Sequence, residues 1–292
     1  MKRILITGAN SFIGTSFERY IKDHFSDQYA VDTVDMIDGG WRNTSFSGYD
    51  TVYHVAGIAH ADNGKISPER EKLYRSVNTD LTIETAKQAK SDGVKQFIFM
   101  SSAIVYGNSA PIGVKKLIMA DTPVNPSNCY GDSKIQAELG LKDLADNNFR
   151  VVILRPPMIY GKGNKGNFAL LEKLALKMPL FPNVQNERSM LYIGNLTEFV
   201  RLMIENDEQG TFWPCNGELS NTSELVRKIG LAKGKKVRMI NGFTWTLKIL
   251  AHFTGLVNKA FGNLAYADEL GTYKANYRLY SLEESIRETE KE

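Results

Sequence analysis

Residues 4–14, ILITGANSFIG, pass from a β-rich run through a glycine-containing turn into a helical pattern. Gly8 permits the tight turn, and Gly14 lets the helix lie close to the strand. The N–H groups at the start of such a helix have no partner in the helix and can bind a pyrophosphate. Ser11 stands where this kind of turn usually has its middle glycine. Its side chain either crowds a bound phosphate or donates a hydrogen bond to it.

Four more β-rich runs follow, at residues 30–34, 51–55, 97–100 and 151–154, with helical patterns between them. Continuous apolar strands separated by helices predict a parallel sheet that is covered on both faces. The fold class is therefore a doubly wound α/β sheet. We expect it to span residues 1–156, with a return segment at about 190–215, and to be followed by a second, less regular region at 157–292.

The composition limits the classes of function. The chain has 292 residues, 42% of them hydrophobic, and a net charge of +3 without a basic stripe, so we expect a globular protein that binds no nucleic acid. Its two cysteines, Cys129 and Cys215, imply no disulfide framework and favour a cytoplasmic location. No targeting segment, membrane span or set of metal ligands is expected.

Asp35 lies 21 residues after Gly14, at the end of the second β-rich run. A carboxylate there accepts hydrogen bonds from an adenosine ribose and repels a 2′-phosphate, which favours NAD over NADP. Arg42 lies a few residues further on and weakens this preference, so NADP stays possible.

Tyr130 and Lys134 are four residues apart at the start of an expected helix and therefore share one face. A nearby cation lowers the pKa of a phenol from about 10 and brings it within reach of proton transfer. Ser101 and Ser102 follow the fourth strand, at the edge of the sheet where ligands bind.

Smaller features point to the same edge. Ala56 and Gly57 end the third strand and leave room for a cofactor. Asn78 either caps a helix or steadies the region of Lys134.

Taken in order, these motifs resemble those of the extended short-chain dehydrogenase/reductases, the NAD-dependent epimerase/dehydratase group that acts on nucleotide sugars. The resemblance continues in Leu154-Arg155-Pro156-Pro157-Met158-Ile159-Tyr160-Gly161. It implies a Rossmann domain, a smaller C-terminal domain that binds a UDP-sugar, and a homodimer. The implied catalytic residues are Ser102, Tyr130 and Lys134, and the implied substrate-binding residues are Ser102, Asn167 and Arg188. The implied cofactor-binding residues are Gly8, Asn10, Ser11, Phe12, Ile13, Gly14, Asp35, Ala56, Gly57, Asn78, Tyr130, Lys134 and Pro157.

The same resemblance narrows the reaction. Sugar 4,6-dehydratases of the family have an Asp-Glu pair where this chain has Ala103 and Ile104, so a dehydratase is disfavoured. The chain resembles a UDP-glucose 4-epimerase-like subgroup, and two reactions at C4 remain. Met158 and a compact second region favour a UDP-4-keto-6-deoxy-N-acetylhexosamine 4-reductase of polysaccharide precursor synthesis. Asp35 favours NAD, and an NAD that stays bound suits a UDP-glucose or UDP-GlcNAc 4-epimerase, because an epimerase regenerates its cofactor in each turnover. A non-enzymatic NAD(P)-sensing regulator is a third, weaker alternative.

Residues 243–261 are rich in large apolar side chains and could rest on a membrane or on a partner. Their polar face lacks the dense Lys and Arg of interfacial helices, so an ordinary packed helix is expected.

Overall fold

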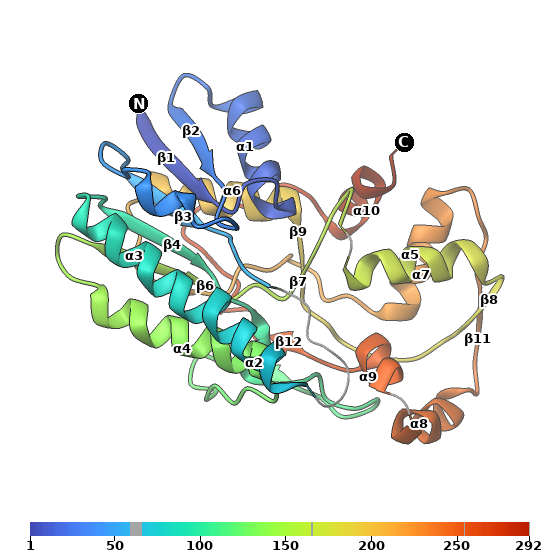
Figure 1. The fold of residues 1–292 in the computed structure, drawn as a ribbon. Coiled ribbons are helices and arrows are strands. Elements are labelled where there is room, and N and C mark those ends of the chain that lie inside the picture. Colours follow the sequence, from blue (N-terminus) through green and yellow to red (C-terminus); the bar gives the residue numbers. More distant parts are fainter. Residues whose placement is uncertain (59–65, 165, 254, 292) are drawn as a thin grey trace. The chain divides into compact units, whose positions relative to one another are not determined.

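The structure is a computed structural model that describes residues 1–58, 66–164, 166–253 and 255–291 (Figure 1). The chain divides into two compact units. The first comprises Met1–Gly107, Pro123–Pro156 and Thr197–Trp213, and the second comprises Asn108–Thr122, Pro157–Leu196 and Pro214–Glu292. Each unit is described by itself. The predicted functional division at residue 156 stays a prediction.

The first unit is built on a six-stranded parallel sheet in the order β10-β6-β4-β3-β1-β2. The strands are β1 (Lys2–Thr7), β2 (Tyr29–Val34), β3 (Thr51–His54), β4 (Gln96–Met100), β6 (Arg150–Leu154) and β10 (Gly210–Phe212). The five predicted strands are confirmed. β10 was not predicted, because its sequence, Gly-Thr-Phe, contains no apolar run. The strand order reverses between β1 and β3, which is where such sheets bind ligands.

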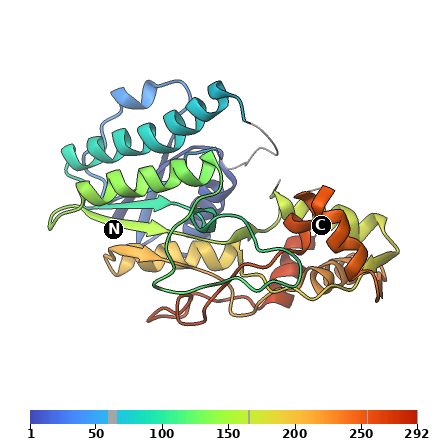
Figure 2. The ribbon, with the colours of Figure 1, turned by 90° about the horizontal axis from the view of Figure 1, so that it is seen from below.

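Helices cover both faces of this sheet (Figures 1 and 2). They are α1 (Phe12–His24), α2 (Pro68–Tyr74), α3 (Leu81–Ser91), α4 (Cys129–Leu144) and α6 (Ile193–Glu205). α3 and α4 lie on one face, and α1 and α6 lie on the other, where the Tyr20 hydroxyl donates to Glu198 at 2.8 Å. The predicted doubly wound α/β fold is confirmed.

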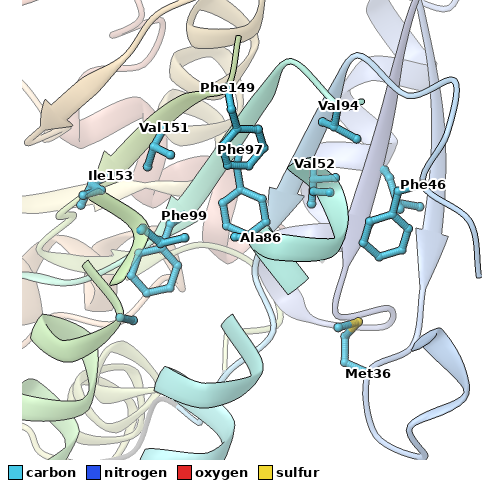
Figure 3. Close-up of a cluster of buried hydrophobic side chains, with 14 of the residues drawn as sticks. Met36, Phe46, Val52, Ala86, Val94, Phe97, Phe99, Phe149, Val151 and Ile153 are labelled. Atoms are coloured by element: carbon cyan, nitrogen blue, oxygen red, sulfur yellow. The ribbon is translucent and has the colours of Figure 1, made fainter. Parts of the chain in front are cut away.

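The hydrophobic core lies between the sheet and α3 and α4 (Figure 3). Phe97, Phe99, Phe149, Val151 and Ile153 alternate along β4, β6 and the residue before β6, so that one face of each strand is apolar toward the helices. Burial of these side chains fixes the register of the central strands.

His54 is fully buried at the end of β3, and its ring nitrogens lie 2.6 Å from Thr7 Oγ1 and 3.0 Å from Thr82 Oγ1. Its ring stacks on Phe97. Burial lowers its pKa to about 3, so the imidazole is neutral. His54 is thus a hydrogen-bonded core residue that ties β3 to its neighbours.

The second unit has three two-stranded parallel pairs. They are β5 (Leu117–Ile118) with β12 (Ala265–Tyr266), β7 (Met158–Tyr160) with β9 (Met190–Tyr192), and β8 (Leu180–Pro182) with β11 (Arg238–Ile240). Its helices are α5 (Asn167–Lys177), α7 (Thr222–Ala232), α8 (Thr244–Phe253), α9 (Gly255–Phe261) and α10 (Leu282–Glu290). α7 packs against both α5 and α10.

Residues 243–261 contain the helices α8 and α9. Val257 and Phe261 of α9 are buried, as an ordinary packed helix requires, but α8 exposes several large apolar side chains. The expectation of ordinary packing is therefore right for α9 and wrong for α8. Among the described residues, no helix is long and apolar enough to cross a bilayer.

Candidate functional site

The turn between β1 and α1 packs closely against the backbone that follows β3. Gly8 has a φ of +101°, and a Cβ on it would lie 2.8 Å from the backbone nitrogen of Ala56. Any other residue would strain the backbone and collide with the end of β3. The turn predicted around Gly8 is thus held in place by backbone packing.

Ser11 caps α1, because its Oγ accepts a hydrogen bond from the N–H of Gly14 at 3.1 Å. The hydroxyl keeps its own proton and can donate it to a second group. Phe12 and Ile13 occupy the first turn of α1, where an N–H has no acceptor within the helix. The turn therefore presents two backbone donors and one hydroxyl, a set that fits a pyrophosphate.

Asp35 directly follows β2 and is exposed, and its Oδ1 accepts a hydrogen bond from the N–H of Ile37 at 2.9 Å. Arg42 does not lie free beside it. The Arg42 guanidinium donates two hydrogen bonds to Glu84 of α3, at 2.5 and 2.6 Å, and stacks over Trp41. The cation that was expected to weaken the preference for NAD is therefore engaged by a carboxylate.

Tyr130 lies in the first turn of α4, which begins at residue 129 because Asn128 accepts a hydrogen bond from the N–H of Gly131 at 2.8 Å. The Ser102 hydroxyl lies near the Tyr130 phenol and lowers the pKa of Tyr130. Ser102 Oγ also accepts from the N–H of Ile104 at 3.3 Å, which fixes the serine at the start of a 3-10 turn. The structure thus brings the predicted phenol and hydroxyl together after β4.

Lys134 is buried, and its Nζ donates to the carbonyl oxygen of Met100 at 2.9 Å and lies 4.6 Å from the centre of the Phe99 ring. A Cβ on Gly57 would lie 3.0 Å from Asn78 Oδ1 and 3.4 Å from this Nζ, so Gly57 lies beside both side chains. Burial lowers the pKa of Lys134 to about 8, although Glu138 favours its charged form. Lys134 and Gly57, which were both predicted to bind the cofactor, therefore lie beside each other.

The pKa of Tyr130 differs from the expectation that Lys134 lowers it. Burial raises this pKa to about 12, and the Ser102 hydroxyl offsets only part of the rise. In this structure the Lys134 ammonium is directed to the carbonyl of Met100. The phenol is therefore protonated at neutral pH until a further positive charge enters the site.

Asn78 lies inside a π-helical turn, Arg75–Asp80, between α2 and α3. Its amide nitrogen donates to Ser133 Oγ at 3.1 Å, and its Oδ1 accepts from the N–H of Ile58 at 2.8 Å. The alternative that Asn78 caps a helix is wrong. The alternative that it steadies the region of Lys134 fits these contacts, because Ser133 directly precedes the lysine.

A buried ionic network under the site was not found from the sequence. The Glu138 carboxylate accepts hydrogen bonds from Arg155 and, at 2.5 Å, from Ser101 Oγ, and Arg155 also donates to the Tyr106 hydroxyl at 2.8 Å. The Trp213 Nε1 donates to the same hydroxyl. Glu138 follows Lys134 by one helical turn, which was an available signal that the carboxylate points the same way.

Three of the predicted residues belong to the second unit. Pro157 is buried before β7, and Asn167 is the exposed first residue of α5. Arg188 Nη1 donates to the carbonyl oxygens of Lys259 and Ala260, at 2.6 and 3.1 Å, and burial lowers the pKa of Arg188. Their roles in binding cofactor or substrate stay predictions.

Comparison with known proteins agrees with this arrangement. Residues 4–213 match the NAD dependent epimerase/dehydratase family. The chain is 33% identical over 289 residues to a UDP-glucose 4-epimerase from Vibrio cholerae, covering 92% of this chain and 85% of the relative. It is 30% identical over 253 residues to the N-acetyl-alpha-D-glucosaminyl-diphospho-ditrans,octacis-undecaprenol 4-epimerase of Escherichia coli O157:H7, covering 80% and 73% of the two chains.

Among solved structures, the fold is similar to that of a UDP-glucuronic acid 4-epimerase from Bacillus cereus in complex with NAD. The TM-score is 0.71 at 18% identity, over 99% of this chain and 97% of the other. The family resemblance inferred from the sequence is thus confirmed. The prediction of an enzyme that depends on a nicotinamide cofactor is confirmed as well. The chain belongs to the NAD dependent epimerase/dehydratase family.

Proposed function

We propose that the chain is a 4-epimerase of a sugar carried on a diphosphate and that it works with retained NAD. The observation that carries this proposal is the Ser102 hydroxyl beside the Tyr130 phenol, with the buried Lys134 one helical turn further along α4. Both relatives described above that cover two thirds or more of the chain are named 4-epimerases, which supports the same reaction.

The first unit offers the groups that NAD requires. The N–H groups of Phe12 and Ile13, together with the Ser11 hydroxyl, would bind the pyrophosphate, and Asp35 would accept from the adenosine ribose. Lys134 would hold the nicotinamide ribose beside Gly57. A bound nicotinamide supplies a hydride acceptor and donor and, when oxidised, a positive charge.

Tyr130 would carry the proton of the reaction. Ser102 would hold the oxygen on C4 of the sugar, and Tyr130 would take the proton from that oxygen and return it. Because burial raises the pKa of Tyr130 to about 12 with Lys134 already in place, the phenolate needs a further positive charge, which an oxidised nicotinamide would supply. Loss and return of the proton are therefore coupled to loading of the site.

We propose that Arg188 and Asn167 bind the diphosphate end of the substrate. The half-buried Arg188 guanidinium donates to backbone carbonyls, and a guanidinium pairs with phosphate oxygens at two points. The carrier is either a nucleotide, as in the name of the Vibrio cholerae relative, or a polyprenol, as in that of the Escherichia coli relative. A cytoplasmic homodimer is the state that we propose for the enzyme.

A 4-reductase of a UDP-4-keto-6-deoxy-N-acetylhexosamine is the second candidate. It is favoured by Met158 and the compact second region, as noted above. The engagement of Arg42 by Glu84 supports the epimerase, because it leaves Asp35 to select NAD.

The two candidates are separated by their need for a reductant. The purified protein is incubated with UDP-glucose, UDP-GlcNAc and a UDP-4-keto-6-deoxy sugar, each with and without added NADH or NADPH. A 4-epimerase inverts C4 of a UDP-sugar without added reductant, whereas a 4-reductase consumes one reductant for each keto sugar. Consumption of reductant without any inversion would replace the proposal by the second candidate.

A further inference from the structure

Helix α8 of the second unit presents an apolar surface to solvent. Trp245, Ile249 and Leu250 are 66%, 53% and 48% exposed, and Phe243, just before the helix, is 47% exposed. Trp245 and Ile249 are four residues apart and share one face of the helix. Four large apolar side chains within eight residues are more than the single exposed residues that any surface carries.

The charge around this surface has one sign. Residues 225–267 contain eight Lys and Arg residues and neither Asp nor Glu. Five of these basic residues are exposed, namely Lys235, Lys236, Arg238, Lys248 and Lys259. Lys248 lies on α8 between Trp245 and Ile249, so apolar and basic groups alternate on the same helix face.

The neighbouring elements hold α8 firmly in the second unit. α8 packs against α9, whose residues Val257 and Phe261 are buried, and the ring of Phe261 lies 5.6 Å from that of Phe181 in β8. Strand β11, which begins with the exposed Arg238, pairs with β8 and leads into α8 (Figure 1). The basic strand and the apolar helix thus belong to one continuous surface segment.

We propose that α8, with Phe243 and the basic residues 235–238 before it, docks on the surface of an anionic lipid bilayer. Exposed Trp and aliphatic side chains enter the region between headgroups and acyl chains, and basic residues are attracted by anionic headgroups. A second copy of this chain is a poorer occupant of the face, because two surfaces that each expose five basic residues from this segment would meet.

The docking surface indicates which carrier holds the sugar diphosphate in the proposed reaction. If the enzyme is a 4-epimerase of a diphosphate-linked sugar, as proposed above, a protein held at a bilayer meets sugars whose diphosphate is carried on a membrane lipid. We therefore infer a lipid-linked diphosphate sugar as the substrate class, which rests on the proposed function, whereas the docking itself does not.

The experiment uses the full chain and two kinds of vesicle, pure phosphatidylcholine and phosphatidylcholine with phosphatidylglycerol. Wild-type protein is expected to sediment with the anionic vesicles, at least about tenfold more strongly than with neutral ones, and less strongly in high salt. Trp245 emission is expected to shift to the blue and to be quenched by brominated lipid, since Trp41 is buried and Trp213 is partly buried.

Three variants make the test specific. Trp245→Ser with Ile249→Ser should lose binding to anionic vesicles at least about tenfold. Lys236→Glu with Arg238→Glu should lose the preference for anionic lipid. Leu219→Ser with Leu279→Ser removes two leucines of the same unit that are 44% and 47% exposed but lie outside residues 225–267, and should bind as wild type does. All six changed side chains are exposed, and a thermal melt checks folding.

Two outcomes would overturn the docking proposal. One is wild-type protein that binds neither kind of vesicle, and the other is binding that the Trp245 and Ile249 changes leave intact. A dimer that becomes a monomer in that double variant, with no vesicle binding by wild type, would assign the face to a second copy.

Because sedimentation requires no turnover, an inactive protein that still binds vesicles would refute only the proposed function. A protein that epimerises UDP-sugars without binding vesicles would refute the docking and the lipid-linked substrate and would leave the proposed function intact.

Discussion

The Glu138 carboxylate accepts two hydrogen bonds from the Arg155 guanidinium, at 3.1 Å from Nε and 2.5 Å from Nη2. Both side chains are buried, and Arg155 directly follows β6. The pair joins α4, one helical turn beyond Lys134, to the carboxyl end of the sheet. Ser101, which follows β4, donates to the same carboxylate. The position of Tyr130 and Lys134 relative to Ser102 therefore depends on this ion pair.

Replacing Glu138 by glutamine should destabilise the protein. The substitution leaves the Arg155 charge buried without its partner, and breaking a buried pair in this way costs about 3–5 kcal/mol. The free energy of unfolding, measured with urea, should fall by that amount. Glu84→Gln breaks the exposed pair with Arg42 and should cost at most about 1 kcal/mol. Equal losses in the two variants would contradict the role given to the buried pair.

The cofactor preference should depend on Asp35 and on the partner of Arg42. Asp35→Ser removes the carboxylate that repels a 2′-phosphate, so the ratio of the NADPH to the NAD dissociation constant should fall roughly tenfold. Glu84→Gln releases the Arg42 guanidinium and should shift the ratio in the same direction. Titration calorimetry measures both constants. Asp38→Ser, which removes a neighbouring exposed carboxylate, is the control and should leave the ratio unchanged.

Stability should depend on pH through Lys134. Its pKa in the folded protein is about 8, below the usual 10.5, so unfolding takes up a proton between these pH values and stability rises across that interval. Below pH 8 the buried charge costs roughly 3 kcal/mol. Lys134→Met removes this cost but also the hydrogen bond to Met100, worth about 1 kcal/mol.

Lys134→Met should therefore stabilise the fold by roughly 2 kcal/mol at pH 7, and the gain should vanish near pH 10. Urea denaturation at both pH values measures it. Lys142→Met, at an exposed position of the same helix, should show no such pH dependence. A gain that is equal at pH 7 and pH 10 would show that the Lys134 pKa is not lowered.

The fold was predictable because its signals are local. The apolar runs at 4–6, 30–34 and 97–100, each followed by a turn or helix pattern, specify parallel strands without reference to distant residues. β10 was missed because three residues at the edge of the sheet need no apolar run. The turn at Gly8 and the placement of Ser102 near Tyr130 also followed from the order of strands in a doubly wound sheet.

Other features depend on contacts between residues far apart in the chain. Arg42 pairs with Glu84, which lies 42 positions further along the chain. The burial that raises the pKa of Tyr130 comes from several elements. Neither feature could be predicted from the spacing of residues. The surface of α8 was missed for another reason. The basic residues that accompany its apolar face lie before the helix, at 235–238, outside the stretch that was compared with interfacial helices.

Tyr130→Phe should lower turnover sharply and leave binding of the dinucleotide nearly unchanged. The phenylalanine keeps the ring and loses only the proton carrier, so we expect a fall in kcat of about 10²–10⁴. Tyr74→Phe is a matched control, since its ring lies 6.0 Å from that of Tyr130, and should keep most of the activity. NAD affinity, measured by calorimetry, separates a loss of chemistry from a loss of binding. Undiminished turnover by Tyr130→Phe would remove this tyrosine from the mechanism.

The central claim is that C4 is inverted by a hydride that leaves the sugar and returns to it. A UDP-sugar, or a polyprenol-diphospho-sugar, that carries deuterium at C4 is incubated with the purified protein and no added reductant, and the product is examined by NMR. The account predicts the C4 epimer with the deuterium still on C4. An epimer that has lost its deuterium to solvent, or no epimer from any of these sugars, would contradict it.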